Sequence, residues 1–476
     1  MDILFKNVTA VTMEKDRPVI FNANVGIDNG RIAFVDQANS DQINSDQINS
    51  GQANSDQANS GKPNPTQAKR IVNGEGKVLI PGLYNCHAHT PMSLLRGFGN
   101  DLALEEWLFD RIFPAERKIK EIKGAVYIGA VLSIAEMIAS GTIAFNDMYF
   151  GLQAIAQAVE ETGVKANLSN AAISFEPEGY DYYKSSEYQE TLHILENYHK
   201  TSYKTIDKTS DNTSGKTSDK TSHGRIKAEA SLHCAYTTHP TAWRQVAEFA
   251  QKHNLTMHVH LSETIAEHNK SLEMFDLTPT AAFASHGVFD VPAIAAHGCW
   301  VTEEDIDILA QKGVTIAHNP VSNLKLASGI APITQMQEKG INIALGTDGM
   351  ASNNTHDLFE EIKLASILQK CTCENPMALP AFQVLEMATV NGAKGAGREG
   401  GLIREGYDAD LVLLDFNSIN QIPSFDPLIN LAYSTTGNNV IMTLCQGRIL
   451  YENGEFTTID IEKIKSEAKK ISENFI

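Results

Sequence analysis

From residue 78 to about residue 347, short apolar runs alternate with stretches that have the periodicity of helices. Short runs that are apolar throughout are typical of parallel strands buried on both faces. About eight such runs occur, near residues 78–86, 142–147, 164–173, 226–233, 255–261, 293–298, 314–318 and 341–347, and a helical stretch follows each run but the last. Eight strand and helix units predict the α/β fold class and, within it, a (β/α)8 TIM-type barrel.

The joints between the predicted helices and strands carry residues that suit a helix end. Gly141, Gly163, Gly313 and Gly340 each stand directly before an apolar run, and Asn254 holds the same position before LTMHVHL. Many helices close with a left-handed residue, a conformation that costs little in glycine because it has no Cβ atom. A doubly wound open sheet is the competing layout, but no Gly-x-Gly-x-x-Gly motif follows a first strand here.

Both ends of the chain carry a different pattern, which indicates strands outside the barrel. Alternating runs occupy residues 3–13, 24–35, 70–80, 409–414 and 440–451, and the turn signals Asn29-Gly30 and Asn453-Gly454 lie among them. We therefore expect a composite β-sandwich domain built from both chain ends, residues 1–80 and 391–476, beside a barrel of residues 81–390. Residues 461–471 have lysines and glutamates around a thin apolar stripe, a pattern typical of an amphipathic helix at the solvated surface.

Two segments interrupt this pattern with low-complexity sequence. Residues 37–68 contain five-residue repeats such as Ser40-Asp41-Gln42-Ile43-Asn44, and residues 200–224 repeat units that resemble Lys-Thr-Ser-Asp. Both segments are too polar to be buried in a core. We expect them to be solvent-exposed insertions, one in each domain.

Composition narrows the possible partners and compartments. The chain of 476 residues is 42% hydrophobic, enough for a sizeable core, and its formal net charge of -19 argues against binding to nucleic acid or to an anionic membrane. The six cysteines are scattered and no Cys-x-x-Cys occurs, so reduced thiols are expected. Neither a signal peptide nor a run of about 18 apolar residues is present, which predicts a cytoplasmic protein.

Polar side chains end five of the predicted strands. The residues at these ends are His87 and His89, His233, His260 followed by Glu263, His297, and Asp348. In a barrel the carboxyl ends of all strands meet at one face, where the functional residues lie. Three histidines and a carboxylate suit a catalytic divalent metal such as zinc, with one position left for an activated water.

The remaining polar groups at these ends suit proton transfer. Glu263 and Asp348 can share the acid and base work, and His297 can orient the nucleophile or stabilise developing charge. Three further residues have less specific interpretations: His258 packs deeper in the barrel, Trp107 walls a pocket or fills core, and His318 lines the site from the seventh strand.

Six segments between about residues 80 and 354 carry a resemblance to a known family. They are PGLYNCHAHTPMSLLRGFGNDLALEEWL, IFPAE, HVHLSET, AAHGCW, AHNPVSNLKLASGIAPI and ALGTDGMASNN. In sequence and in order they resemble the metal-dependent amidohydrolase superfamily, most closely its 5-methylthioadenosine/S-adenosylhomocysteine deaminase branch. The β-rich ends also resemble the composite sandwich domain of that family.

The resemblance implies a role for each matched residue. It implies that His87, His89, His260 and Asp348 bind the metal and that Glu263 is the proton shuttle. It also implies that His233, Glu263 and Asp348 contact the substrate. The acid of IFPAE, Glu116, matches the residue that holds ribose hydroxyls. His233 stands where two-metal relatives carry a modified lysine, which favours one divalent metal per subunit, expected to be Zn²⁺. The stretch AAISFEPEGYDYY lacks the arginine that family members place near the substrate tail, and SLHCAYTTHP departs from the usual proline-flanked setting of His233.

The expected function is hydrolytic deamination of an adenosine-like nucleoside to the inosine analogue and ammonia. The candidate substrates are 5-methylthioadenosine, S-adenosylhomocysteine, 5'-deoxyadenosine and adenosine. One alternative keeps the site but acts on another aminated heterocycle, such as guanine, a pterin or a triazine. A non-catalytic metal-binding or ligand-binding relative is the alternative from another class. The expected partner is the small-molecule substrate, and a homo-oligomer is possible.

Overall fold

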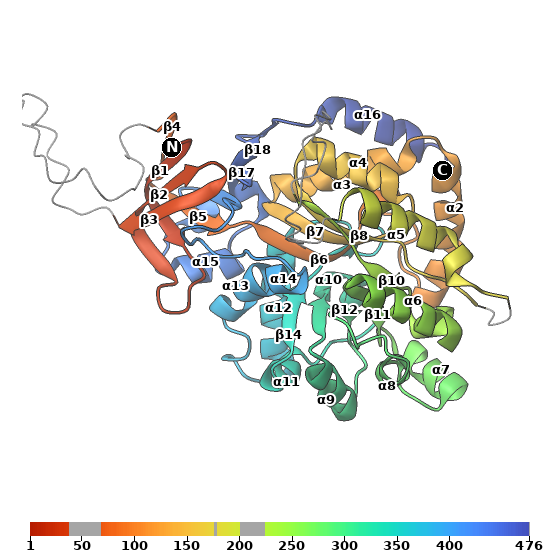
Figure 1. Ribbon diagram of the computed structural model, residues 1–476. Helices are drawn as coiled ribbons and strands as arrows, with labels where there is room; N and C mark the ends of the chain where they lie inside the picture. Colours follow the sequence, from red (N-terminus) through yellow and green to blue (C-terminus); the bar gives the residue numbers. More distant parts are fainter. Residues whose placement is uncertain (38–67, 176–178, 200–223, 476) are drawn as a thin grey trace, which may run out of the picture.

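The computed structural model of the protein describes residues 1–37, 68–175, 179–199 and 224–475. Figure 1 shows a sheet-rich part, formed by both ends of the chain, next to a larger part in which helices surround strands. The insertions expected at residues 37–68 and 200–224 lie almost entirely outside the described residues.

Strands from both chain ends form one mixed sheet, which has nine strands within the described residues. Its order is β19-β18-β17-β16-β5-β1-β2-β3, and β4 pairs with β1 as well. The turn Asn29-Gly30 joins β2 to β3 with positive φ angles of 49° and 78°, as a tight hairpin turn requires. The strands are β1 (Ile3–Val11), β2 (Val19–Asp28), β3 (Arg31–Gln37), β4 (Arg70–Asn73), β5 (Lys77–Pro81), β16 (Leu411–Asp415), β17 (Val440–Cys445), β18 (Arg448–Glu452) and β19 (Glu455–Phe456).

The larger part contains two parallel sheets, each of five strands in the part of the chain that the structure describes. One sheet has the order β15-β6-β7-β8-β9 and the other β10-β11-β12-β13-β14. Every predicted run contains a strand, but the fourth run is divided into two short strands at Glu229. The strands are β6 (Leu83–His89), β7 (Thr142–Met148), β8 (Lys165–Ser169), β9 (Ile226–Ala228), β10 (Ala230–Leu232), β11 (Met257–Leu261), β12 (Ala293–His297), β13 (Thr315–His318), β14 (Asn342–Leu345) and β15 (Asp348–Gly349).

Backbone contacts join the two parallel sheets at two places. Ala172, which follows β8, forms a parallel bridge with Leu232 of β10. At the other junction the N–H of Gly346 donates to the carbonyl of His318 (3.0 Å), and the N–H of Thr347 donates to the carbonyl of His87 (3.1 Å). The link between β14 and β15 is therefore bonded to both sheets.

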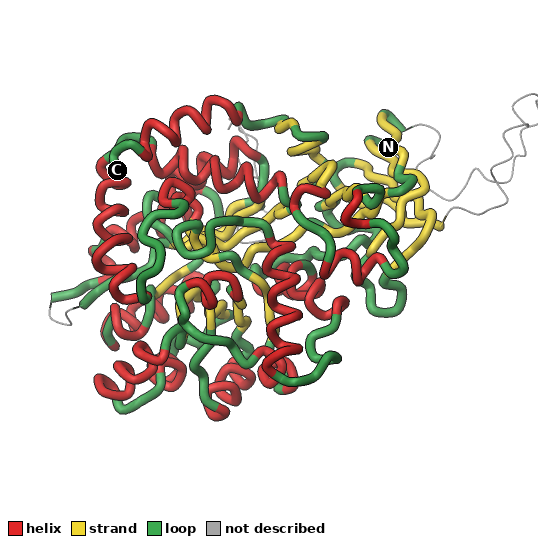
Figure 2. Tube along the Cα trace, turned by 180° about the vertical axis from the view of Figure 1, so that it is seen from behind, coloured by secondary structure: helices red, strands yellow, loops and turns green. Residues whose placement is uncertain are grey.

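Helices pack around the parallel strands, as the tube in Figure 2 shows from behind. They end where the glycine pattern predicted: Gly163 and Gly313 close α4 and α9 with φ angles of 92° and 65°, and Asn254 closes α6 at 52°. The longer helices are α2 (Phe113–Glu121), α3 (Ala125–Ala139), α4 (Leu152–Thr162), α5 (Ser186–Asn197), α6 (Pro240–His253), α7 (Ile265–Phe275), α9 (Glu303–Lys312), α12 (Leu358–Thr372), α13 (Ala381–Ala388) and α16 (Ile461–Ser472). Shorter ones are α1 (Leu104–Glu106), α8 (Pro279–Ser285), α10 (Pro320–Lys325), α11 (Ile333–Glu338), α14 (Val390–Gly395) and α15 (Pro427–Tyr433), and a π-helical segment spans Trp107–Ile112.

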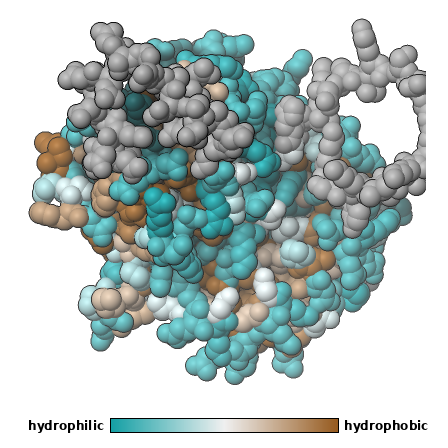
Figure 3. All heavy atoms as spheres, turned by 60° about the vertical axis from the view of Figure 1, so that its left-hand side comes forward, coloured by the Kyte–Doolittle hydropathy of each residue, from teal (hydrophilic) through white to brown (hydrophobic). Residues whose placement is uncertain are grey.

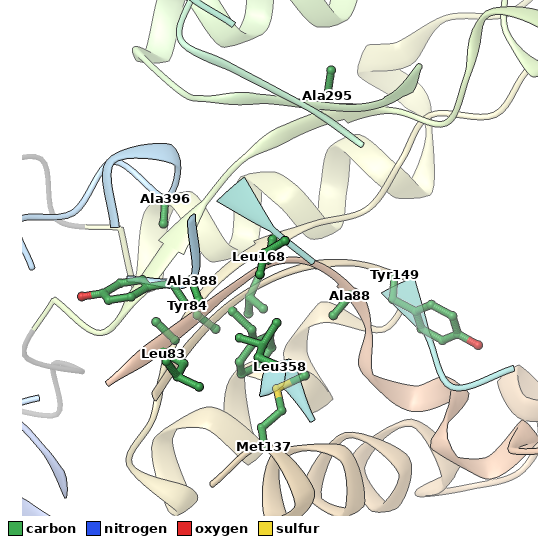
Figure 4. Close-up of a cluster of buried hydrophobic side chains, with 14 of the residues drawn as sticks. Leu83, Tyr84, Ala88, Met137, Tyr149, Leu168, Ala295, Leu358, Ala388 and Ala396 are labelled. Atoms are coloured by element: carbon green, nitrogen blue, oxygen red, sulfur yellow. The ribbon is translucent and has the colours of Figure 1, made fainter. Parts of the chain in front are cut away.

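One large core lies between the parallel strands and the helices around them. Figure 4 shows part of it, with side chains that include Leu83, Met137 and Leu358 from β6, α3 and α12. The terminal helix α16 contributes to this core, because its apolar stripe, which includes Ile464 and Ile471, is buried where α16 packs on α3. The predicted amphipathic helix is present, and its polar residues such as Lys465 and Lys469 are exposed as expected of a surface helix. The contact of its apolar stripe with α3 was not predicted.

Hydrophilic side chains cover most of the face seen in Figure 3, and apolar ones occur there in patches. Among the described residues, no single helix has the length and hydropathy of a membrane span. The segments Leu104–Glu121 and Ala125–Ala139 meet that test only as a pair, which is bent by 112°.

Candidate metal centre and substrate cavity

The predicted polar residues meet at the carboxyl ends of the parallel strands. His87 and His89 lie at the end of β6, His260 near the end of β11, and His297 at the end of β12, while Asp348 begins β15. The ligand atoms of His87, His89 and Asp348 lie within 4.8 Å of one another, and so do those of His87, His260 and His297. All five side chains are at least nine-tenths buried. The fold thus brings residues more than 250 positions apart into one cluster.

Individual distances show how closely the donor atoms approach one another. Asp348 Oδ1 lies 3.1 Å from His89 Nε2 and 3.4 Å from His87 Nε2. His260 Nε2 lies 3.4 Å from His89 Nε2. Lone pairs from several imidazoles at this spacing repel one another unless a cation or a proton lies among them.

Hydrogen bonds on the far side of two rings fix which nitrogen is free. His89 Nδ1 lies 2.5 Å from the carbonyl oxygen of Met148, and His260 Nδ1 lies 2.8 Å from that of His233. A carbonyl oxygen only accepts, so each Nδ1 carries the hydrogen and each Nε2 turns a lone pair toward the cluster. Such outer bonds are the usual support of metal-binding histidines, and this donor set fits a divalent metal.

His87 has a longer support that runs through the interior. Its Nδ1 lies 3.0 Å from Nε2 of His258, and Nδ1 of His258 lies 3.4 Å from Oε2 of Glu229. The other Glu229 oxygen, Oε1, accepts from the amides of Asn146 (2.7 Å) and Asn167 (2.8 Å). If His87 donates its Nδ1 hydrogen to His258, its Nε2 is free for a metal, and the hydrogen on His258 then faces the Glu229 carboxylate.

This support was only partly visible in the sequence. The prediction that His258 packs deeper than His260 agrees with the contact to His87. Glu229 carried no such signal, because it lies between two short strands and no motif marks it.

Asp348 is oriented by two serines, one from helix α10 and one from the turn that follows β15. Its Oδ2 accepts from the hydroxyls of Ser322 (2.6 Å) and Ser352 (2.9 Å), which leaves Oδ1 facing the histidines. Burial alone would raise the pKa of Asp348, but the imidazoles of His87 and His89 hold it well below its ordinary value. The charged carboxylate is therefore the form that the site favours.

Glu263 and His297 face each other beside the cluster. His297 Nε2 lies 3.6 Å from Glu263 Oε2, and Ser328 donates to the other Glu263 oxygen at 3.1 Å. Burial raises the pKa of Glu263, and the nearby His297 opposes that shift. A carboxyl group whose pKa is raised in this way can both give and accept a proton.

The backbone at two of these residues is unusual. His297 has a φ of 76° and Asp348 a φ of 62°. Both angles lie in the left-handed region, which residues other than glycine rarely adopt. Non-glycine residues in this region cost roughly 1–3 kcal/mol each and tend to cluster at functional sites. His297 is also fixed by its Nδ1, which lies 2.8 Å from Asn323 Oδ1.

A cavity opens next to the cluster. His89, His260, His297 and Asp348 line one side of it, together with Glu263. Much of the remaining lining is apolar or aromatic and comes from Met92, Leu104, Trp107, Leu108, Phe113, Met148, Phe150, Ala171, Ile173 and Leu326. Trp107 therefore walls a pocket, one of the two roles predicted for it, whereas His318 is fully buried and is not among the lining residues.

All four predicted substrate-binding residues, Glu116, His233, Glu263 and Asp348, line the same cavity. Burial raises the pKa of Glu116 to about 7, and the Tyr149 hydroxyl partly offsets that effect. Burial lowers the pKa of His233 to about 4, so its imidazole is neutral at pH 7. His233 Nδ1 lies 2.9 Å from Thr237 Oγ1.

Comparison with known proteins identifies the family. The profile of the Amidohydrolase family matches residues 78–450. The chain belongs to this family. A 5-methylthioadenosine/S-adenosylhomocysteine deaminase of Acetivibrio thermocellus is 37% identical over 478 residues, which cover 100% of both chains. A 5'-deoxyadenosine deaminase of Methanosarcina acetivorans is 36% identical over 475 residues, which cover 100% of this amidohydrolase and 98% of the relative.

A solved structure of this fold is also similar over the full length. It is a crystal structure of an adenosine deaminase from Xanthomonas campestris with bound zinc, which superposes with a TM-score of 0.83 at 27% identity. The match covers 100% of this chain and 98% of the other.

Proposed function

We propose that this amidohydrolase deaminates adenosine-like nucleosides that carry a modified 5' position, and releases ammonia and the inosine analogue. The observation that carries the proposal is the position of Glu263 and Asp348, two acid and base groups that line one cavity beside a converging histidine cluster. Two relatives that match over essentially their full length bear the names of such deaminases, which supports the same reaction.

The fold proposal is that the two parallel sheets close into one (β/α)8 barrel. Hydrogen bonds at both junctions, through Ala172 and Leu232 and through the link between β14 and β15, support closure. In this proposal residues 81–390 form the barrel, while residues 1–80 and 391–476 form the composite β-sandwich. The separate core among Phe5, Leu79 and Leu411 supports the second domain.

One divalent metal, Zn²⁺, is proposed to bind His87, His89, His260 and Asp348. The imidazole Nε2 atoms and the carboxylate of these four residues are donors that zinc prefers, and a similar solved structure holds zinc. When bound, the metal would supply Lewis acidity, which lowers the pKa of a water molecule toward neutrality. His297 is proposed to orient the attacking water, because its Nδ1 faces Asn323 and its Nε2 lone pair can accept a hydrogen bond from that water.

The protein groups then move the protons of the reaction. Asp348 accepts a proton from the attacking water as the new bond to C6 forms, and Glu263 donates a proton to the ring nitrogen N1. The bond between C6 and the amino nitrogen breaks when that nitrogen, protonated through Asp348, leaves as ammonia. Each molecule of nucleoside consumes one molecule of water, and Glu263 regains its proton from the adduct.

Glu116 and His233 are proposed to hold the sugar. An ionised Glu116 can accept hydrogen bonds from two ribose hydroxyls, and the neutral His233 can exchange one further hydrogen bond with the nucleoside. Their position in the cavity supports this assignment.

Ammonia release tests the proposed function directly. Zinc-loaded protein would be assayed with adenosine, 5'-deoxyadenosine, methylthioadenosine, S-adenosylhomocysteine, guanine and cytosine, beside a sample treated with chelator. We expect chelator-sensitive release from the nucleosides. Release from a free base alone would instead favour a deaminase of another heterocycle, and no release from any compound would favour a non-catalytic relative.

A further inference from the structure

We infer that the cavity selects an apolar 5' substituent, such as a hydrogen or a short thioether, and discriminates against an amino-acid tail. This inference rests on the proposed function, because it assumes that a nucleoside occupies the cavity with its base at the histidine cluster. It concerns what the wall beyond the ribose can recognise.

The first support is the charge of the cavity. Four acidic side chains line it, Glu116, Glu263, Glu267 and Asp348, and no lysine or arginine does so among the described residues. An amino-acid tail brings one ammonium and one carboxylate. The ammonium could approach a lining carboxylate, but the tail's own carboxylate would then lose its hydration without a cationic partner, which is unfavourable.

The second support is the helix that carries Glu116. Phe113 lies three residues before Glu116 on α2, a spacing that places two side chains on the same face of a helix. The Phe113 ring also lies 6.1 Å from the ring of His233, between centroids. An aromatic ring thus lies beside both groups proposed to hold the sugar.

Further rings continue from Phe113 toward the surface. Phe109 packs edge-on against Phe113 with 5.5 Å between centroids, and Phe175 lies 6.1 Å from Phe109. Phe109 is 37% exposed and Phe175 is 58% exposed. Phe113 lines the cavity, and Phe109 and Phe175 extend this aromatic strip from it to the surface. The strip of Phe113, Phe109 and Phe175 offers a thioether sulfur favourable contacts, and its rings offer a carboxylate neither a hydrogen-bond donor nor a cation.

Two lysines lie near the cavity without lining it. Lys120 Nζ lies 4.2 Å from the centre of the Phe150 ring, and Lys270 Nζ lies 5.1 Å from the centre of the Tyr236 ring. Both rings line the cavity. The two lysines are therefore the cations by which a charged tail would be recognised if the inference were wrong.

The test compares kcat/KM of the zinc-loaded protein for methylthioadenosine, 5'-deoxyadenosine and S-adenosylhomocysteine. We expect the first two to exceed the third by at least about tenfold, because the unpaired tail charge is desolvated only in the third. An equal or higher value for S-adenosylhomocysteine would overturn the inference while leaving the proposed deamination intact. No ammonia from any nucleoside would instead refute the proposed function, on which the inference depends.

A charge introduced into the aromatic strip gives a second, independent measurement. Phe109→Arg places a cation beside Phe113 at a partly exposed position, where a polar side chain can be accommodated. We expect it to raise kcat/KM for S-adenosylhomocysteine relative to methylthioadenosine, whereas the neutral variant Phe109→Gln does not. An unchanged ratio in Phe109→Arg, or a wild-type preference for S-adenosylhomocysteine that is lost in Lys120→Met or Lys270→Met, would contradict the role given to the strip.

Discussion

Replacing Glu229 with glutamine tests how His87, a proposed metal ligand, is held. The oxygen of the new amide can still accept from Asn146 and Asn167, so its NH₂ group faces His258 Nδ1. An NH₂ group cannot accept a hydrogen bond. His258 then carries its hydrogen on Nε2 and donates to His87 Nδ1, which moves the hydrogen of His87 to Nε2, the atom proposed to bind the metal.

The size of the effect follows from this change of tautomer. The substitution keeps the volume of a fully buried side chain and removes one charge, so it opens no cavity. Mutation of such outer partners typically weakens metal binding about 10–100-fold. That factor corresponds to a free-energy change of about 1.4–2.8 kcal/mol in metal binding. Three of the four proposed ligands keep their own support.

The measurement is the zinc dissociation constant, obtained by competition with a chromogenic chelator. Thermal unfolding of the metal-free protein checks that each variant is folded. Asp305→Asn is the matched control, because Asp305 is a buried carboxylate that caps the remote helix α9 and should alter stability without altering zinc affinity. His258→Gln provides a second variant, which leaves His87 an amide oxygen as acceptor but removes the link to Glu229. Unchanged zinc affinity in both folded variants would refute the support proposed for His87.

Three further predictions concern the proton shuttle, the sugar site and the domain contact. Glu263→Gln should bind zinc normally and lose turnover by about 10²–10⁴-fold, the usual contribution of an acid or base, and wild-type turnover would remove that role. Burial raises the Glu116 pKa from 4.5 to about 7, so KM for nucleosides should rise as pH falls through 7 and the acceptor becomes protonated; an equally steep rise in Glu116→Gln would assign that dependence to another group. Lys165 of β8 lies 2.8 Å from Asp408 and 2.5 Å from Asp410, just before β16, so Lys165→Met should lower the free energy of unfolding by about 3–5 kcal/mol with zinc affinity unchanged. Urea denaturation of metal-free protein would measure that loss, and a change below about 1 kcal/mol would mean that the pair behaves as an exposed one.

The strands and most of the site were predictable because they depend on local rules. A glycine marks a helix end because its backbone adopts the left-handed conformation easily. A polar residue at a strand end can be recognised wherever an apolar run stops, as at His297. The groups that support the site depend on tertiary structure instead. Ser322 of helix α10 and Ser352 of the turn after β15 both donate to Asp348, and no pattern in the sequence relates either serine to that carboxylate. The apolar stripe of α16 was visible in the sequence, but its packing partner was not, since helix α3 lies more than 300 residues away.

The division of the fourth predicted strand at Glu229 is explained by the same interior network. β9 ends at Ala228 and β10 begins at Ala230, yet the N–H of Glu229 still donates to the carbonyl of Leu168 at 3.0 Å. The backbone thus changes its pairing from one parallel sheet to the other at the residue whose side chain is directed to His258. Asn167, which donates to Glu229, accepts in turn from Arg398 at 2.7 Å. A continuous series of polar groups therefore links the proposed metal ligand His87 to a residue beyond the opposite ends of the strands. A buried series of this kind is stable only when every member has a partner. Substitutions of Glu229 should therefore weaken metal binding while the parallel sheets stay folded.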